Sequence, residues 1–303
     1  MGAQPRRSRL RRRWLLAVAL APLATRSGAT AQAPLRVVTT SADLASIARS
    51  VGGDRVTVES LASPAQDPHG FEVKPVQLAR LRRADLVIRI GLDHEPWLAR
   101  IEIPAHVPVL DTSRSVRLVQ TETPRLRVGR SAHVHAFGNT HYWLDPANAL
   151  AMAAAIRDAL ARARPADAAA FRAHHDTFSR ELNARMASWS QALAPFRGAK
   201  IVVVHDSWSY FAERFGLQIV AAAEPQPGVP PAPVELAALL RRMREAGVRV
   251  IIADPHANAS LVAELERRSG ARAVTLAPSG SDYLQLIDSG VTRLAVALRG
   301  AGP

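Results

Sequence analysis

The stretch FRAHHDTFSRELNARMASWSQAL, residues 171–193, predicts one long amphipathic helix in the middle of the chain. Its apolar side chains recur at every third or fourth position, which aligns them in a single stripe. Pro165 precedes the pattern and Pro195 follows it, so a helix over residues 166–193 is expected. At 1.5 Å per residue it would be about 40 Å long, enough to run along two lobes and fix their orientation. The stripe consists of Phe171, His175, Phe178, Leu182, Met186, Trp189 and Leu193.

The segments on either side of this helix repeat one order of short apolar runs and helical patterns. Strands that alternate with helices indicate parallel sheets built from βαβ units. The predicted fold class is therefore α/β, with two parallel-sheet (βα)4-type lobes joined by one long rigid helix. The predicted strands are 35–41, 56–62, 84–91 and 108–113, then 200–206, 217–223, 248–254 and 271–277. The predicted helices are 43–51, 75–83, 95–101, 208–215, 233–246, 259–269 and 282–299, with a further helix opened by Asp145 and Pro146.

The N-terminus has the order of regions that is typical of a secretory signal. Residues 1–13 are basic, residues 14–24 form an apolar run, and Ala29-Thr30-Ala31 fits a small-residue cleavage site. The apolar run is shorter than the roughly 20 residues that a membrane-spanning helix needs. We expect a signal peptide over 1–31, an N-terminal lobe over 32–165, a linking helix over 166–193 and a C-terminal lobe over 194–303. The mature protein is expected to be soluble and periplasmic, with Sec and Tat export both open.

Charge and cysteine content narrow the classes of function. The formal net charge is +13, but residues 1–31 contain seven Arg and no acid, which leaves 32 basic against 26 acidic residues in the mature chain. This modest excess argues against a nucleic-acid partner. The chain contains no Cys, so any metal site must use His, Asp, Glu or water. No G-x-x-x-x-G-K-[ST] phosphate loop is present in the sequence.

Polar side chains that follow the predicted strands are the candidate ligands. In open parallel sheets, ligands bind at the carboxyl ends of the strands. His69 lies on the loop predicted after the second strand, and His141 lies just before the helix opened by Asp145. His205 directly follows the apolar run Ile201–Val204 near the end of its predicted strand, and Asp282 follows the last strand. Three imidazoles and one carboxylate would suit zinc, in a cleft whose closure brings ligands from both lobes together. Spacing alone leaves ordinary loop histidines as the alternative.

Several stretches resemble the metal-specific solute-binding proteins of ABC importers, the zinc/manganese-binding family with two lobes joined by one rigid helix. They are Asp67-Pro68-His69-Gly70-Phe71-Glu72, His141-Tyr142-Trp143-Leu144-Asp145-Pro146, Val204-His205-Asp206-Ser207-Trp208, the Glu224-Pro225-Gln226-Pro227-Gly228 segment and Asp282-Tyr283. The resemblance covers nearly all of the mature chain. It implies a metal site in the cleft between the lobes, with His69, His141 and His205 as ligands. Histidine at the third position implies zinc, whereas members with Glu there are associated with manganese or iron.

The sequence also departs from the family pattern. The fourth-ligand Asp often lies two residues before the Tyr, but here Ser281 holds that position and Asp282 precedes Tyr283 directly. Either Asp282 or water is therefore expected in the fourth position. The long His-rich loop of many zinc members is reduced to His133 and His135, which would either capture metal weakly or form a solvated loop. His94 and His256 also follow strands, and each is a further ligand candidate or a loop residue.

The resemblance implies capture of Zn²⁺, with Mn²⁺ or iron as the alternative, and delivery to a permease in the inner membrane. The expected partners are the metal ion, that permease and, as a further candidate, a periplasmic metallochaperone. The chain is expected to be a monomer and not an enzyme. The alternative from another class is a periplasmic zinc hydrolase with Glu72 or Asp206 as its base, but no HExxH pattern supports it. A third alternative is a metal-free binding protein for a small organic molecule.

Overall fold

The computed structural model of the chain describes residues 1–2, 32–66, 71–119, 138–224 and 228–300. Residues 34–303 form one structural unit and residues 1–33 another. The predicted signal peptide, His69, His133 and His135 lie outside the described residues. None of the described helices is long and apolar enough to cross a membrane.

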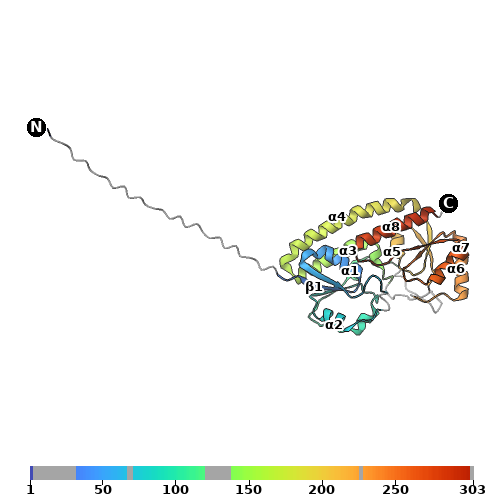
Figure 1. Cartoon of the computed structure of the whole chain (residues 1–303), viewed down its shortest axis with the longest axis horizontal. Coiled ribbons are helices and arrows are strands. Elements are labelled where there is room, and N and C mark those ends of the chain that lie inside the picture. The colour runs from blue at the N-terminus through green and yellow to red at the C-terminus, as the bar shows by residue number, and fades with distance from the viewer. Residues whose placement is uncertain (3–31, 67–70, 120–137, 225–227, 301–303) are drawn as a thin grey trace. The chain divides into compact units, whose positions relative to one another are not determined.

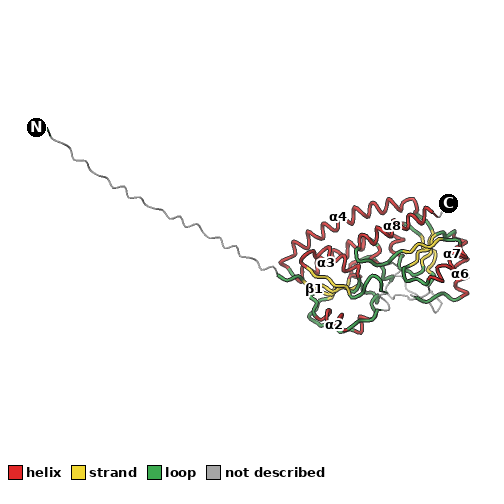
Figure 2. Tube along the Cα trace, viewed as in Figure 1, coloured by secondary structure: helices red, strands yellow, loops and turns green. Residues whose placement is uncertain are grey.

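Two parallel sheets form the two lobes (Figure 2). The first contains β1 (Leu35–Thr39), β2 (Val56–Ser60), β3 (Leu86–Arg89) and β4 (Val109–Asp111) in the order β2-β1-β3-β4. The second contains β5 (Lys200–Val203), β6 (Gln218–Ala222), β7 (Val250–Ala253) and β8 (Arg272–Thr275) in the order β6-β5-β7-β8. Every pairing is parallel, as predicted, and the order is the same in both sheets.

The central strands are buried on both faces. In β5 and β7 the runs Ile201–Val203 and Val250–Ala253 are apolar throughout, because helices cover both sides of a parallel sheet. Such continuous β-branched runs are what made all eight strands predictable. The structure shortens them to four or five residues, or three in β4, since the outer residues of each predicted run belong to the adjoining loops.

The helices also follow the prediction closely. They are α1 (Ala42–Gly52), α2 (Pro75–Arg82), α3 (Pro146–Ala163), α4 (Ala168–Leu193), α5 (Ser209–Phe215), α6 (Pro233–Ala246), α7 (Ala259–Ser269) and α8 (Tyr283–Gly300). Asp145 caps α3 as expected, because its carboxylate accepts a hydrogen bond from the backbone N–H of Ala147. The helix predicted over 95–101 is instead a short 3₁₀ helix, Pro96–Arg100. Its Glu95 carboxylate is turned back toward β3 rather than capping a longer helix.

The long helix is confirmed as α4, which spans 26 residues. It begins at Ala168, because Pro165–Asp167 forms a separate 3₁₀ turn. It packs on α1 and α3 of the first lobe and on α8 of the second, as Figure 1 shows. The Trp189 indole N–H donates to the Asp288 carboxylate of α8 at 3.0 Å. The buried stripe is Phe171, Phe178, Leu182, Trp189 and Leu193, with His175 and Met186 half-buried.

One hydrophobic core joins the two lobes. It contains the inner faces of both sheets, represented by Ile88 and Ile252, together with the stripe of α4. Two smaller clusters, one per lobe, pack the outer helices against the outer faces of the sheets. Since the shared core is continuous, the carboxyl ends of both sheets are held at constant positions relative to each other.

Candidate metal centre

The strand order identifies one crevice in each sheet. The chain passes from β1 to β2 and then crosses to β3 on the other side of β1, so the order reverses between β1 and β3. The same reversal occurs between β5 and β7. Ligands of open α/β sheets bind outside the carboxyl ends of the strands at such reversal points. His94 follows β3 and His205 follows β5, which places both histidines at these crevices.

The structure brings together two of the predicted ligands, one from each side of the cleft. The imidazole rings of His141 and His205 lie with their centroids 5.4 Å apart and their planes at 78°. Two imidazoles bound tetrahedrally to one zinc have ring centres roughly 5 Å apart, because each Zn–N bond is about 2.1 Å long. The positions of these two rings therefore fit one shared metal ion. Within the described ranges, however, no three His, Asp or Glu side chains already surround a common point.

Asn139 orients the His141 ring. Its side-chain oxygen accepts hydrogen bonds from the backbone N–H of His141 at 2.9 Å and from Nδ1 at 3.2 Å. Because an amide oxygen only accepts, Nδ1 carries the proton and Nε2 carries the lone pair that a metal needs. The Asn139 amide group donates in turn to the backbone carbonyl of Asp206, the neighbour of His205, at 2.8 Å. Sequence reasoning missed this residue, although an Asn two positions before a ligand was the available signal.

Glu224 lies beside His205. Its carboxylate oxygen is 3.9 Å from Nδ1 of the imidazole, and its side chain is only 6% exposed. The same oxygen accepts from the backbone N–H of Gly228 at 3.1 Å. A carboxylate near the remote nitrogen of a ligand imidazole holds the ring in its metal-binding tautomer. In the sequence, Glu224 stood out only as part of a stretch that resembles the family.

Asp282 occupies a different hollow. It is exposed and accepts a hydrogen bond from the backbone N–H of Gln285 in the first turn of α8. Together with Arg49, Glu181 and Arg185 it lines a cavity of about 550 Å³ between α1, α4 and α8. The loop before it is tied to α1, since Ser279 and Gly280 both donate to the Asp43 carboxylate. Its role as the fourth ligand stays a prediction.

Two buried tryptophans, Trp143 and Trp208, lie close in the sequence to His141 and His205. Trp143 lies 5.2 Å from the His141 ring, and its indole N–H donates across the lobes to the Pro278 carbonyl at 2.8 Å. Trp208 is buried, and its indole N–H donates to Asp254 at 3.0 Å. Burial raises the pKa of the Asp254 carboxyl to about 6, while the bonds from Trp208 and Ser207 lower it. Satisfied indole donors let these large rings lie in the interior beside the histidines.

Further hydrogen bonds join the lobes around the site. The Tyr210 hydroxyl donates to the Asn139 carbonyl and the Tyr283 hydroxyl donates to the Trp143 carbonyl, both at 2.7 Å. Asp145 forms a two-pronged ion pair with Arg214, with N–O distances of 2.6 and 2.8 Å. These buried contacts oppose any large rotation of one lobe against the other.

Replacing Arg214 with Leu should lower the free energy of unfolding by about 2 kcal/mol, because it leaves the Asp145 carboxylate buried without its cation. This value lies below the range of about 3–5 kcal/mol for fully buried pairs, since the Arg214 side chain is 34% exposed. Urea unfolding of the metal-free protein measures the loss. Arg241→Leu is the matched control, because its ion pair with Glu245 is exposed. Equal losses in the two variants would show that the Asp145–Arg214 pair stabilises the fold no more than an exposed ion pair does.

Comparison with known proteins agrees with this architecture. The family model described as "Zinc-uptake complex component A periplasmic" matches residues 37–297. The high-affinity zinc uptake system protein ZnuA of Paracoccus denitrificans is 28% identical over 304 residues, which cover 88% of this chain and 89% of that protein. The zinc-binding protein AdcA of Streptococcus pyogenes serotype M6 is 22% identical over 90% of this chain. The chain spans only 58% of the length of AdcA.

A solved structure of a ZnuA deletion mutant with zinc bound superposes with a TM-score of 0.76 at 26% identity, covering 87% of this chain and 98% of that one. The two sheets and the helix between them are thus the architecture of one protein family. Because the family model covers most of the chain, this protein belongs to the family of periplasmic zinc-uptake complex component A.

Proposed function

We propose that this protein captures Zn²⁺ in the cleft between its lobes and delivers it to the permease of an ABC importer. The observation that carries the proposal is the 5.4 Å separation of the His141 and His205 rings across the cleft. The sequence predicts His69, which follows β2 in the chain, as the third imidazole ligand. It predicts Asp282 or water as the fourth ligand. The names of the relatives, zinc uptake protein and zinc-binding protein, support the same cargo.

Neutral imidazoles favour zinc over manganese and iron, which prefer sites with more carboxylate oxygen. The proposed role is transport and not hydrolysis. A catalytic zinc keeps an open position for water next to a general base, and no HExxH pattern is present in the sequence. The protein acts outside the cytoplasm, where the predicted signal peptide would direct it.

Release requires the permease to displace a ligand or to break contacts between the lobes. The hydrogen bonds of Tyr210 and Tyr283 and the ion pair of Arg214 resist spontaneous opening. A site held closed in this way retains its metal until a partner supplies the free energy that opens it.

Zinc titration of residues 32–303, followed by native mass spectrometry, tests the function. One tightly bound zinc per chain is expected. At free zinc about 100-fold above the dissociation constant, binding should stabilise the fold by about 2.7 kcal/mol, which raises the melting temperature until a chelator is added. A second, weak equivalent that disappears on replacing His133 and His135 would assign the short loop. Absence of tight zinc would refute the proposal and direct attention to small organic ligands.

A further inference from the structure

We propose that His94 is a protein ligand of the same metal ion as His141 and His205, and that its imidazole completes the shell in the place that the sequence assigned to Asp282. This inference rests on the proposed function, because it concerns the coordination of the captured metal. Four observations support it: the ring positions, the hydrogen bond at Nδ1, the strained turn before His94 and the framework that holds that turn.

The ring of His94 lies against the ring of His141. Their centroids are 5.4 Å apart, the same separation as between His141 and His205. His141 is therefore close enough to share a metal ion with two imidazoles. One is His94 of the same lobe, and the other is His205 of the second lobe. The planes of the His94 and His141 rings stand at 89°, close to the 78° between the rings of His141 and His205. Trp143 closes the group, 5.1 Å from His94.

The remote nitrogen of His94 is hydrogen-bonded as in metal-binding histidines. Nδ1 lies 2.9 Å from the hydroxyl oxygen of Thr140, which is itself fully buried. When Nδ1 donates to this hydroxyl, Nε2 is the nitrogen with the coordinating lone pair. Thr140 directly precedes His141, and Asn139 makes the corresponding bond to Nδ1 of His141. One three-residue segment thus orients both imidazoles.

The backbone before His94 is strained. Gly91, Leu92 and Asp93 all have positive φ, at 82°, 55° and 56°. Leu92 and Asp93 are not glycine, so this left-handed conformation is unfavourable for both residues. A side chain added at Gly91 would collide with the Asp111 carboxylate, 2.3 Å from its Cβ, so the close approach demands glycine. The turn directs the His94 side chain into the interior, where it is 1% exposed.

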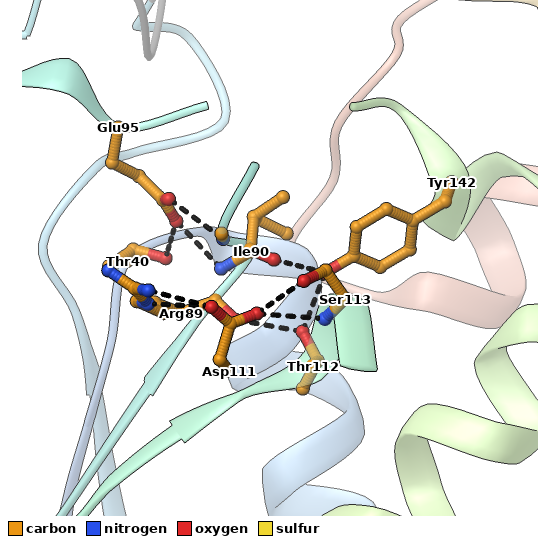
Figure 3. Close-up of polar contacts among 9 residues, drawn as sticks. Thr40, Arg89, Ile90, Glu95, Asp111, Thr112, Ser113 and Tyr142 are labelled. Atoms are coloured by element: carbon orange, nitrogen blue, oxygen red, sulfur yellow. Dashed lines mark hydrogen bonds and ion pairs between the residues drawn. The ribbon is translucent and has the colours of Figure 1, made fainter. Parts of the chain in front are cut away.

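A buried polar framework maintains this turn (Figure 3). The Glu95 carboxylate accepts hydrogen bonds from Thr40 at 2.6 Å and from the backbone N–H groups of Ile90 and Gly91 at 2.7 and 3.0 Å. The Tyr142 hydroxyl, next to His141, donates to the Ile90 carbonyl at 2.6 Å. The segments that carry His94 and His141 are therefore fastened to each other, which is how a binding site is pre-organised.

The position of Asp282 agrees with this assignment. Its carboxylate faces the hollow of α1, α4 and α8 and caps α8, whereas His94 lies within the histidine and tryptophan cluster. Replacing a carboxylate by an imidazole would make the shell more nitrogen-rich and electrically neutral. Such a shell discriminates further in favour of zinc against manganese.

The test compares His94→Phe with Asp282→Asn and with the exposed control His106→Phe. Phenylalanine preserves the ring that packs on His141 and Trp143 but removes both nitrogens. Zinc dissociation constants come from chelator competition, and X-ray absorption of the zinc complex counts imidazole ligands. We expect His94→Phe to weaken binding at least 30-fold and to lose one imidazole, while Asp282→Asn and His106→Phe stay within threefold of the unmutated protein.

An affinity of His94→Phe within threefold, with an unchanged imidazole count, would overturn the inference and leave the proposed function standing. A large loss in Asp282→Asn alone would restore the carboxylate as fourth ligand. Failure of the unmutated protein to bind zinc would instead refute the function itself. If His94→Phe does not fold, long-range ¹H–¹⁵N spectra of the unmutated protein decide, because zinc must shift Nε2 of His94 as strongly as that of His205.

Discussion

Replacing His205 with Ala is expected to weaken zinc binding by at least two orders of magnitude. The substitution removes one nitrogen donor at about 2.1 Å from the metal, and no neighbouring group can take its place without moving backbone. The nearest candidate is Glu224, whose carboxylate lies on the Nδ1 side of the ring rather than at the metal-facing nitrogen. Chelator competition on the metal-free protein measures the change.

The matched control for this substitution is His256→Ala. His256 follows β7 just as His205 follows β5, but its side chain is exposed, whereas the His205 side chain is only 20% exposed. It should leave the zinc affinity within threefold. The metal-free melting temperature of His205→Ala should also change little, which separates a lost ligand from a damaged fold. Retention of affinity within threefold by His205→Ala would mean that the two facing rings do not share a metal.

The stability of the protein should fall as pH rises from about 4 to about 7, because of one buried acid between the lobes. Asp43 lies in the first turn of α1 and is fully buried. Its carboxylate accepts hydrogen bonds from the Ser279 hydroxyl at 2.5 Å and the Gly280 backbone N–H at 3.0 Å. Burial raises the pKa of this carboxyl from 3.8 to about 7, although those bonds lower it. Among the described residues, no cation contributes to this shift in the pKa of Asp43.

The sign of the effect follows from the pKa difference. Since the folded pKa of Asp43 exceeds the unfolded value, the folded state holds the proton more tightly than the unfolded state does. The resulting stabilisation is complete below pH 4 and is lost as pH rises through about 7. One pKa unit corresponds to about 1.4 kcal/mol, so a rise from 3.8 to about 7 makes the loss roughly 4 kcal/mol.

Asp43→Asn isolates this contribution, because the amide stays neutral at every pH. Relative to the variant, the unmutated protein should lose about 4 kcal/mol of unfolding free energy between pH 4 and pH 8. Urea titrations of both metal-free proteins at several pH values give the difference directly. Asp54→Asn, at an exposed carboxylate, controls for the loss of an acid. A difference that does not vary with pH would show that Asp43 is not the responsible group.

The sequence was sufficient to predict the parallel sheets and the helix that joins them. Their signals are local and strong: continuous β-branched runs in β5 and β7, a seven-turn apolar stripe in α4 and an Asp-Pro helix start at Asp145. It predicted a full helix over 95–101, where one 3₁₀ turn exists. The error arose because Glu95 resembles a helix-starting residue. Its carboxylate instead accepts hydrogen bonds from the backbone N–H groups of Ile90 and Gly91 and from the hydroxyl of Thr40, which lies 55 residues earlier in the chain.

The sequence by itself determined the fold class, because parallel strands and helices have strong local patterns, whereas the pairing of His141 with His205 was predicted through the family resemblance. Only the tertiary structure decided which other groups join that pair. It brought His94 to the His141 ring through a left-handed turn, placed Glu224 beside His205, and set Asp282 in a separate hollow. Loop conformations and contacts between lobes depend on groups far apart in the chain, whose meeting no local pattern records.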